Sequence, residues 1–226
     1  MICHIDEIVA AARAGRPVIM IDAETRKNEG HLIVPAQFAD AATINFMARH
    51  CRGIVALAIT AERARELGLK PMVRWNESHY QMAYTVSIEA RSGVSTGISA
   101  GDRAQTIRTA IDPHSGALDI VTPGHVFPII ASEGGLTARP GHTEAAIEIC
   151  QRAGLIPAAA VCAIMGVDGS MATRAELAGL AAAHDLPVGL VGDLMAPRPA
   201  MTRLAEAAIL PFNAAQRGGM RHAAAG

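Results

Sequence analysis

The sequence predicts one layered α/β or α+β domain, and three observations support this fold class. The chain has 226 residues, enough for one large domain. No linker-like stretch divides its middle. Apolar runs typical of buried strands are interleaved with segments of helical periodicity. We therefore expect a domain over residues 1–198 and a loose C-terminal tail over residues 199–226, where Pro, Ala and Gly become frequent.

The first part of the chain begins with a helix and a buried strand. Residues 6–14 have a helical period that ends at Gly15, a residue type favoured just after helix ends. Residues 17–22 form an apolar run, and a loop follows as far as Gly30. The same signals place a strand at 32–35, a helix at 43–50, a strand at 53–59, a helix start at Thr60 and an alternating strand at 84–90.

The second part of the chain continues the alternation of helices and strands. A helix opens with Asp102 and Arg103, and another runs from Gly141 to Ala153 and is closed by Gly154. In chain order we expect helices at 99–110 and 141–153, a strand at 157–165, a helix at 174–184 and a strand at 187–191.

Composition argues against nucleic acid and membranes as partners. The net charge is −1, and the chain has only one Trp, two Tyr and four Phe, whereas nucleic-acid binding needs a basic face. The longest charge-free apolar run, residues 155–167, is shorter than the roughly 20 residues that span a bilayer. No signal peptide is visible at the N-terminus, and the scattered cysteines predict buried thiols. We therefore expect a cytoplasmic protein.

Two predicted helix starts carry residues suited to binding an anion. Arg139-Pro140-Gly141-His142-Thr143 precedes the helix at 141–153, where unpaired backbone N–H groups and the helix dipole attract a phosphate. Arg139 can add a bidentate contact and Thr143 a hydroxyl donor, although Thr143 could equally be a helix cap. The helix at 99–110 offers Asp102, Arg103 and Thr106. From these residues we expect a small anionic substrate, bound by Arg139, Gly141, His142, Thr143, Asp102, Arg103 and Thr106.

Three polar segments, 26–31, 123–128 and 139–144, resemble motifs of the 3,4-dihydroxy-2-butanone 4-phosphate synthase family, riboflavin-pathway enzymes that act on ribulose 5-phosphate. The resemblance extends from about Ile5 to Arg198 and implies that family's three-layer fold. It also implies that residues 139–143 hold the substrate phosphate, that Arg26 and Glu29 belong to the site, and that His125 takes part in catalysis. Since two chains pair in the family, with the sites near their interface, it further implies a homodimer.

Several positions depart from the family motifs. Lys27 and His31 stand where the family has a magnesium-binding Glu and an Asp that contacts the sugar, and Ala163 replaces a proton-transferring Glu. The segment 80–85 replaces Gly-Thr-x-Phe-Thr. An ammonium group cannot coordinate a cation, which leaves His142 as the family metal ligand that is retained. We therefore expect no metal cofactor, and magnesium only if the family chemistry is retained.

These replacements lead to three hypotheses about function. The first is a lyase-like enzyme of altered chemistry, acting on a small phosphorylated or otherwise anionic carbonyl compound by enolisation and proton transfer. It would use Lys27, Glu29, His31 and His125 as catalytic residues and would not carry out the metal-dependent elimination of formate. The second is a functional 3,4-dihydroxy-2-butanone 4-phosphate synthase, and the third is an inactive, anion-binding homologue.

Overall fold

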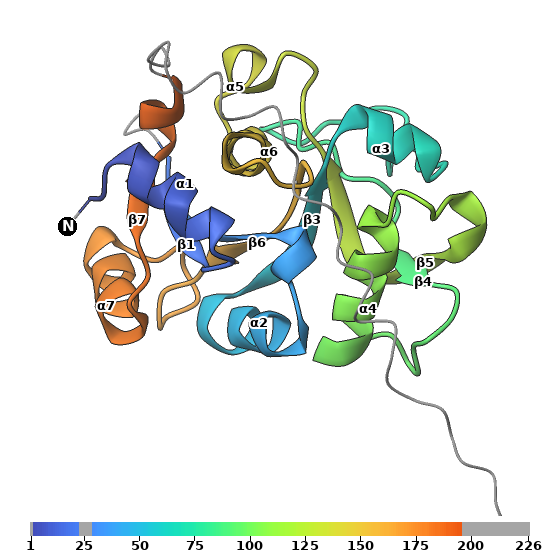
Figure 1. The fold of residues 1–226 in the computed structure, drawn as a ribbon, viewed down its shortest axis with the longest axis horizontal. Coiled ribbons are helices and arrows are strands. Elements are labelled where there is room, and N and C mark those ends of the chain that lie inside the picture. The colour runs from blue at the N-terminus through green and yellow to red at the C-terminus, as the bar shows by residue number, and fades with distance from the viewer. Residues whose placement is uncertain (1, 23–28, 196–226) are drawn as a thin grey trace, which may run out of the picture.

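The computed structural model describes residues 2–22 and 29–195, and a single seven-stranded sheet forms its centre (Figure 1). The strands are β1 (Val18–Ile21), β2 (Gly30–Pro35), β3 (Arg52–Ile59), β4 (Ile88–Ala90), β5 (Ile120–Ile130), β6 (Ala158–Ile164) and β7 (Val188–Leu190). Their order across the sheet is β4-β5-β3-β6-β2-β1-β7. The pairs β1/β7 and β3/β5 are parallel and the others antiparallel, so the sheet is mixed.

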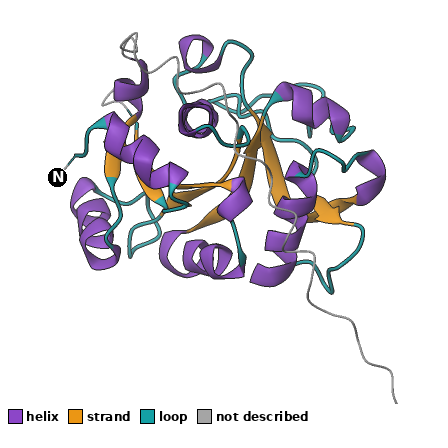
Figure 2. Ribbon diagram, viewed as in Figure 1, coloured by secondary structure: helices purple, strands orange, loops and turns teal. Residues whose placement is uncertain are grey.

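Helices cover both faces of this sheet and complete three layers (Figure 2). The α-helices are α1 (Ile5–Arg13), α2 (Ala41–Phe46), α3 (Ala61–Glu66), α4 (Ala100–Ile111), α5 (Gly135–Ala138), α6 (His142–Ala153) and α7 (Arg174–His184). The short helical turns are η2 (Ala36–Phe38), η3 (Met47–Cys51), η4 (Ala117–Asp119) and η5 (Val191–Met195). Helices α1 and α6 lie on one face, and α2, α4 and α7 on the other. The predicted fold class is confirmed.

The alternation of side chains along the strands supplies one hydrophobic core to each face. On β2, Leu32 and Val34 pack with α2, α4 and α7, whereas Ile33 packs with α1 and α6. On β6, Cys162 faces the first core and Val161 the second. All five side chains are buried, so the central strands are covered on both sides.

The predicted helix boundaries agree closely with the structure because the capping residues can be recognised in the sequence by their type. Thr60, Ser99 and Thr173 accept a hydrogen bond from the backbone of the first turn of α3, α4 and α7. Gly154 adopts a left-handed conformation, with φ of 70°, at the end of α6. The helix expected at 43–50 is α2 followed by the π-helical turn η3.

One strand prediction was wrong and one strand was not predicted. Of residues 84–90, only Ile88–Ala90 forms a strand, and Tyr84 makes an isolated bridge to Ile129. The long strand β5 was not predicted, because Pro123 and Pro128 break the pattern typical of a strand. The chain tolerates Pro123 because the register between β4 and β5 shifts between the pairs Glu89–Val121 and Ile88–Val126. The predicted tail at 199–226 lies outside the described residues.

Within the described part of the chain, no helix is both long enough and apolar enough to cross a membrane.

Candidate active site

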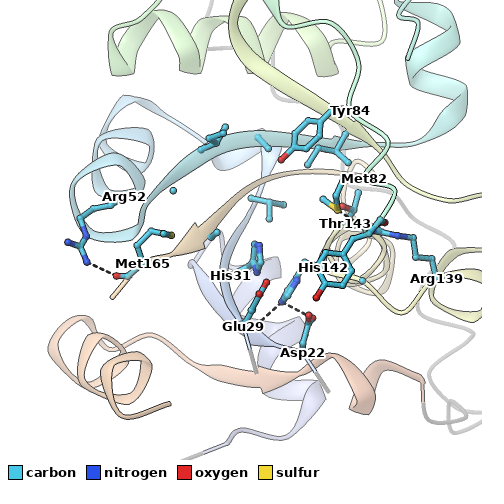
Figure 3. Close-up of a pocket in the computed structure, with 18 residues that line it drawn as sticks. Asp22, Glu29, His31, Arg52, Met82, Tyr84, Arg139, His142, Thr143 and Met165 are labelled. Carbon is cyan, nitrogen blue, oxygen red and sulfur yellow. Dashed lines mark hydrogen bonds and ion pairs between the residues drawn. The ribbon is translucent and has the colours of Figure 1, made fainter. Parts of the chain in front are cut away.

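A cavity of about 470 Å³ opens on the face of the sheet that α6 covers (Figure 3). Strands β2, β3 and β6 form its floor, and the N-terminus of α6 and the segment 80–84 form its sides. Its polar residues are Asp22, Glu29, His31, Arg52, Arg139, His142 and Thr143. Its apolar and aromatic residues are Ile54, Ala56, Tyr80, Met82, Tyr84, Ile129, Val161, Ala163 and Met165. The cavity is therefore polar beside α6 and β2 and largely apolar along β3 and β5.

A bulge in β3 shapes one wall of the cavity. The register between β3 and β6 shifts between Arg52 and Val55, where Arg52 has a left-handed φ of 65°. The Arg52 guanidinium donates hydrogen bonds to the carbonyl oxygens of Met165, at 2.6 Å, and of Gly166. A Cβ atom on Gly53 would lie 2.4 Å from the carbonyl oxygen of Ala163, so only glycine fits there.

Two histidines meet at the floor of the cavity. His31 on β2 and His142 at the start of α6 stack with ring centroids 3.6 Å apart. Nε2 of His142 lies 3.0 Å from Oδ1 of Asp22 and 3.2 Å from the carbonyl oxygen of Glu29. Among the described residues, Oδ1 of Asp22 has no hydrogen-bond partner, so its contact with His142 is close but not aligned as a hydrogen bond. These contacts fix the position of the His142 ring.

His31 is a buried histidine with an unused ring nitrogen. Burial, and then the charge of the neighbouring His142, lower the pKa of His31 well below its usual range. The imidazole is therefore neutral at neutral pH. Its Nδ1 atom is buried and has no hydrogen-bond partner among the described residues. A buried polar atom of this kind usually has a partner, which here a ligand in the cavity can supply.

The helix start that was predicted to bind an anion lies at the cavity, but its arginine already has partners within the protein. Nη1 of Arg139 lies 2.9 Å from Oε2 of Glu144, whose side chain is completely buried. Nη2 of Arg139 faces the carbonyl oxygen of Tyr80 at 3.3 Å and the sulfur of Met82 at 2.9 Å. The Glu144 carboxylate neutralises much of the guanidinium charge. What remains for an anion is the helix start with the Thr143 hydroxyl.

The residues predicted at the start of α4 lie outside the wall of this cavity. The Asp102 carboxylate accepts hydrogen bonds from the Ser95 hydroxyl at 2.8 Å and from the Gly97 backbone at 3.1 Å. The Ser95 hydroxyl is the main cause that lowers the pKa of Asp102. The Thr106 hydroxyl accepts from the backbone of Ala90 and donates to the carbonyl oxygen of Asp102. Substrate binding by Asp102, Arg103 and Thr106 stays a prediction.

His125 is also remote from the cavity of the single chain. It is exposed on β5, and its Nδ1 lies 3.2 Å from Oε2 of Glu89 on β4. Of the other predicted site residues, Arg26 and Lys27 lie outside the described residues. The structure brings together Glu29, His31, Arg139, Gly141, His142 and Thr143.

Two polar residues that line this cavity, Asp22 and Arg52, were not predicted from the sequence. Asp22 is the first residue after β1, and an acidic residue directly after a buried strand was the available signal. Arg52 gave no such signal, because an arginine beside a glycine is common in any protein. Tyr84 belongs to the segment 80–85, whose departure from the family motif had marked it as part of the pocket wall.

The described residues do not form a metal site. No group of three His, Cys, Asp or Glu side chains in this part of the chain is placed to hold an ion. The nearest arrangement is the pair Asp22 and His142, with His31 stacked beside it. Magnesium prefers several oxygen ligands, which this donor set does not supply.

The fold and this cavity define a mixed α/β protein with a cavity of small-molecule size beside the start of α6. A model of the 3,4-dihydroxy-2-butanone 4-phosphate synthase family matches residues 6–197. The chain belongs to this family.

The curated relatives and solved structures agree with this assignment. The synthase of Neisseria meningitidis serogroup B is 47% identical over 205 residues, covering 91% of this chain and 56% of the relative. That of Cupriavidus pinatubonensis is 47% identical over 195 residues, covering 86% and 87%. The chain thus spans about half the length of some relatives and most of others.

Two solved structures match the fold closely. The two-domain synthase RibBX of A. baumannii has a TM-score of 0.82 at 42% identity, over 85% of this chain and 57% of its own. A synthase in complex with two magnesium ions has a TM-score of 0.80 at 35% identity, over 85% of this chain and 94% of its own.

The comparisons contradict the first hypothesis, an enzyme of altered chemistry that no longer eliminates formate. Relatives 46–48% identical over 85–91% of the chain are named as the synthase itself, which favours the second hypothesis. The error was to give three substituted positions, Lys27, His31 and Ala163, more weight than similarity along the whole domain. A pocket is built by many elements, and those that surround this one all lie inside the matched region.

Proposed function

We propose that this protein is a functional 3,4-dihydroxy-2-butanone 4-phosphate synthase. It would convert ribulose 5-phosphate into dihydroxybutanone phosphate and formate, in the cytoplasm and as part of riboflavin synthesis. One observation carries the proposal: the helix start that suits a phosphate opens into the same cavity as Glu29, His31 and His142. The names of the relatives supply the reaction.

In this proposal the two ends of the substrate bind to different parts of the cavity. The first-turn N–H groups of α6 and the Thr143 hydroxyl hold the phosphate. That placement brings the carbon chain of the sugar over the stacked rings of His31 and His142. The reaction begins with the loss of a proton next to the carbonyl group, which needs a base within hydrogen-bond reach.

We assign the proton transfers to residues at the floor of the cavity. The neutral His31 imidazole has an unused nitrogen, and the Glu29 side chain lines the same space. His142, which Asp22 and the Glu29 carbonyl oxygen hold in place, can stabilise negative charge that develops on the substrate oxygen. Asp22 acts through His142 and is a positioning residue.

The magnesium requirement is open to a direct test. One solved relative holds two magnesium ions, but in this chain Lys27 occupies the position of a family ligand and the described residues offer no group of three donors. Assays with added magnesium and with a chelator would distinguish a magnesium-dependent reaction from one that does not need the ion. Equal rates in both would show that the reaction here does not depend on the ion.

We also infer that the working form is a homodimer. His125 is exposed on β5 and does not reach the cavity of its own chain. Large apolar side chains are exposed on and around the segment 71–86, including Ile54, Val73 and Trp75. A second copy that covers this surface would also bring in further polar residues. Sedimentation that shows only a 23.5 kDa species at micromolar concentration would overturn the inference.

Formate release tests the proposed reaction. Purified protein is incubated with ribulose 5-phosphate and magnesium, and formate is measured with a coupled dehydrogenase. We expect formate and dihydroxybutanone phosphate in equal amounts. No formate above background would refute the proposal, and saturable binding of ribulose 5-phosphate in the same sample would then favour the inactive, anion-binding homologue.

A further inference from the structure

We propose that the hydroxyl group of Tyr84 binds the substrate directly, through a hydrogen bond to a hydroxyl or carbonyl oxygen of the sugar phosphate. Tyr84 would then be a specificity-determining residue of this chain. The inference rests on the proposed function for the identity of the sugar phosphate. The position of the tyrosine in the cavity is independent of that identity.

The backbone around Tyr84 holds its side chain in the cavity. The Tyr84 N–H donates to the carbonyl oxygen of Met82 at 2.9 Å, and its own carbonyl oxygen accepts from Met72 at 2.8 Å. A bridge to Ile129 ties the residue to β5, and the next residue, Thr85, donates to the carbonyl oxygen of Pro128 at 3.0 Å. With both neighbours fixed to β5, the ring remains in the wall of the cavity (Figure 3).

The hydroxyl of Tyr84 has no hydrogen-bond partner among residues 2–22 and 29–195, the part of the chain that the structure describes. Its side chain is nevertheless half-buried. A tyrosine in this environment usually has a partner for its hydroxyl group. Burial raises the pKa of Tyr84, so the group stays protonated and can donate. The side chains of Ala56 and Ile129, which line the same cavity, are apolar and cannot accept a hydrogen bond.

An unused polar atom on another wall strengthens the inference. Nδ1 of His31, on β2, is buried and unpaired among the described residues. Tyr84 and His31 both face the same cavity of about 470 Å³ and come from different elements. A polyhydroxylated ligand between them could satisfy both atoms. An apolar ligand would leave both polar atoms without a hydrogen-bond partner.

The family motif shows why the hydroxyl can be tested without disturbing the fold. Where that motif has Phe, this chain has Tyr84, so an aromatic ring fits the position and the hydroxyl group is the added feature. Tyr84→Phe therefore removes one oxygen atom and keeps the ring in place. Its effect on binding reports on the hydroxyl group alone.

Fluorine NMR and kinetics together test the proposal. The chain has two tyrosines, so protein labelled with fluorotyrosine gives two signals, and Tyr84→Phe identifies that of Tyr84. We expect this signal to shift saturably with ribulose 5-phosphate, or with its aldose isomer ribose 5-phosphate. In Tyr84→Phe we expect the KM for ribulose 5-phosphate to rise about 5- to 20-fold, with kcat changed less than about threefold.

A matched variant controls for the loss of a hydroxyl group elsewhere. Ser170→Ala removes the hydroxyl of an exposed residue outside the cavity, where it bonds to Asp168, and should leave KM unchanged. An unmoved Tyr84 signal at saturating sugar phosphate, or an unchanged KM in Tyr84→Phe, would overturn the proposal. A saturable shift without formate release would support the Tyr84 contact while refuting the synthase.

Discussion

The cavity beside α6 and the start of α4 look alike in the sequence but differ in the structure. Both are helix starts with a charged residue and a threonine, and both were predicted to bind the substrate. At the start of α4, Asp102 and Thr106 form their hydrogen bonds within the protein. In the cavity, His31 and Tyr84 face open space with polar atoms that the described residues leave unpaired.

The same types of polar residue thus serve either stability or ligand binding, depending on whether the fold supplies their hydrogen-bond partners. A polar group that the fold already satisfies contributes to stability, and its removal should mainly affect unfolding. A polar group that the fold leaves unsatisfied costs stability, and a bound ligand can supply its missing partner. We therefore expect substitutions in the cavity to change catalysis and those of Asp102 and Thr106 to change stability; Arg103, whose buried Nε has no hydrogen-bond partner among the described residues, falls outside this contrast.

The largest effect is expected for His142→Asn. Asparagine keeps a donor near Asp22 but cannot exchange a proton or carry a charge. Formate release should fall by about two to four orders of magnitude. Circular dichroism and thermal unfolding should remain close to those of the unmodified protein. Turnover that falls less than about tenfold would remove His142 from the reacting centre.

The next effect concerns Arg139, which lines the cavity but already has a partner within the protein, Glu144. Arg139→Met leaves the buried Glu144 carboxylate without its partner and should lower the free energy of unfolding by about 3–5 kcal/mol. Adding Glu144→Gln should restore part of that loss. Urea unfolding of the two variants measures both changes. Arg16→Met breaks an exposed ion pair with Asp185 and, as a control, should cost less than about 1 kcal/mol.

A different outcome would change the role of Arg139. If Arg139→Met unfolds like the unmodified protein but binds sugar phosphate weakly, the guanidinium serves the anion more than Glu144. The sequence prediction for Arg139 would then hold in its original form.

The elements that could be predicted from the sequence are those with local causes. Helices α3, α4 and α7 begin at Thr60, Ser99 and Thr173 because a nearby hydroxyl group caps each first turn. Strand β5 was not predicted because it is stabilised by pairing with β3 and β4, which are distant in the sequence. Its own sequence shows prolines, which argue against a strand. Local patterns thus recover most of the layers but not every strand.

The candidate site was predictable only in part, for the same physical reason. His142 and Thr143 follow from their place at a helix start, and His31 from the family motif. The ion pair of Arg139 with Glu144 and the close contact of Asp22 with His142 depend on how α6 is oriented against the sheet. Whether the described residues offer the Tyr84 hydroxyl a partner depends on all the elements that surround the cavity, which no local pattern contains.

A smaller effect is expected for Asp102→Asn. The Ser95 hydroxyl and the nearby backbone N–H groups lower the pKa of Asp102, so the ionised form stabilises the fold. This contribution is present above the unfolded pKa of about 3.9 and disappears as pH falls through the lower folded value. The melting temperature of Asp102→Asn should therefore be lower than that of the unmodified protein at neutral pH, and the gap should close in acid.

Kinetics of the same variant test the comparison directly. We expect the KM for ribulose 5-phosphate to stay within about threefold of the unmodified value, since this carboxylate lies outside the cavity. A rise of about tenfold or more would place the start of α4 in the substrate site, as the sequence predicted.

The smallest effect is a pH dependence that comes from the cavity itself. Burial, and then His142, lower the pKa of His31. Below about pH 6.5, His31 therefore binds a proton in the unfolded chain but stays neutral in the folded protein. The unfolded state then binds more protons, and the free energy of unfolding must decrease as pH falls below that value. A single histidine can change the free energy of unfolding by at most about 1.4 kcal/mol per pH unit.

His31→Gln should remove this term, because glutamine does not titrate. Urea unfolding in steps from about pH 7.5 to 5.5 should give a shallower slope for His31→Gln than for the unmodified protein. Histidines that do not contact His31 contribute equally in both proteins and cancel in this difference, whereas the stacked His142 does not. Equal slopes for His31→Gln and the unmodified protein would mean that His31 takes up its proton in the folded state. The cavity would then be as fully solvated as the surface. The contrast with Asp102, whose stabilising contribution is lost only below about pH 4, would disappear.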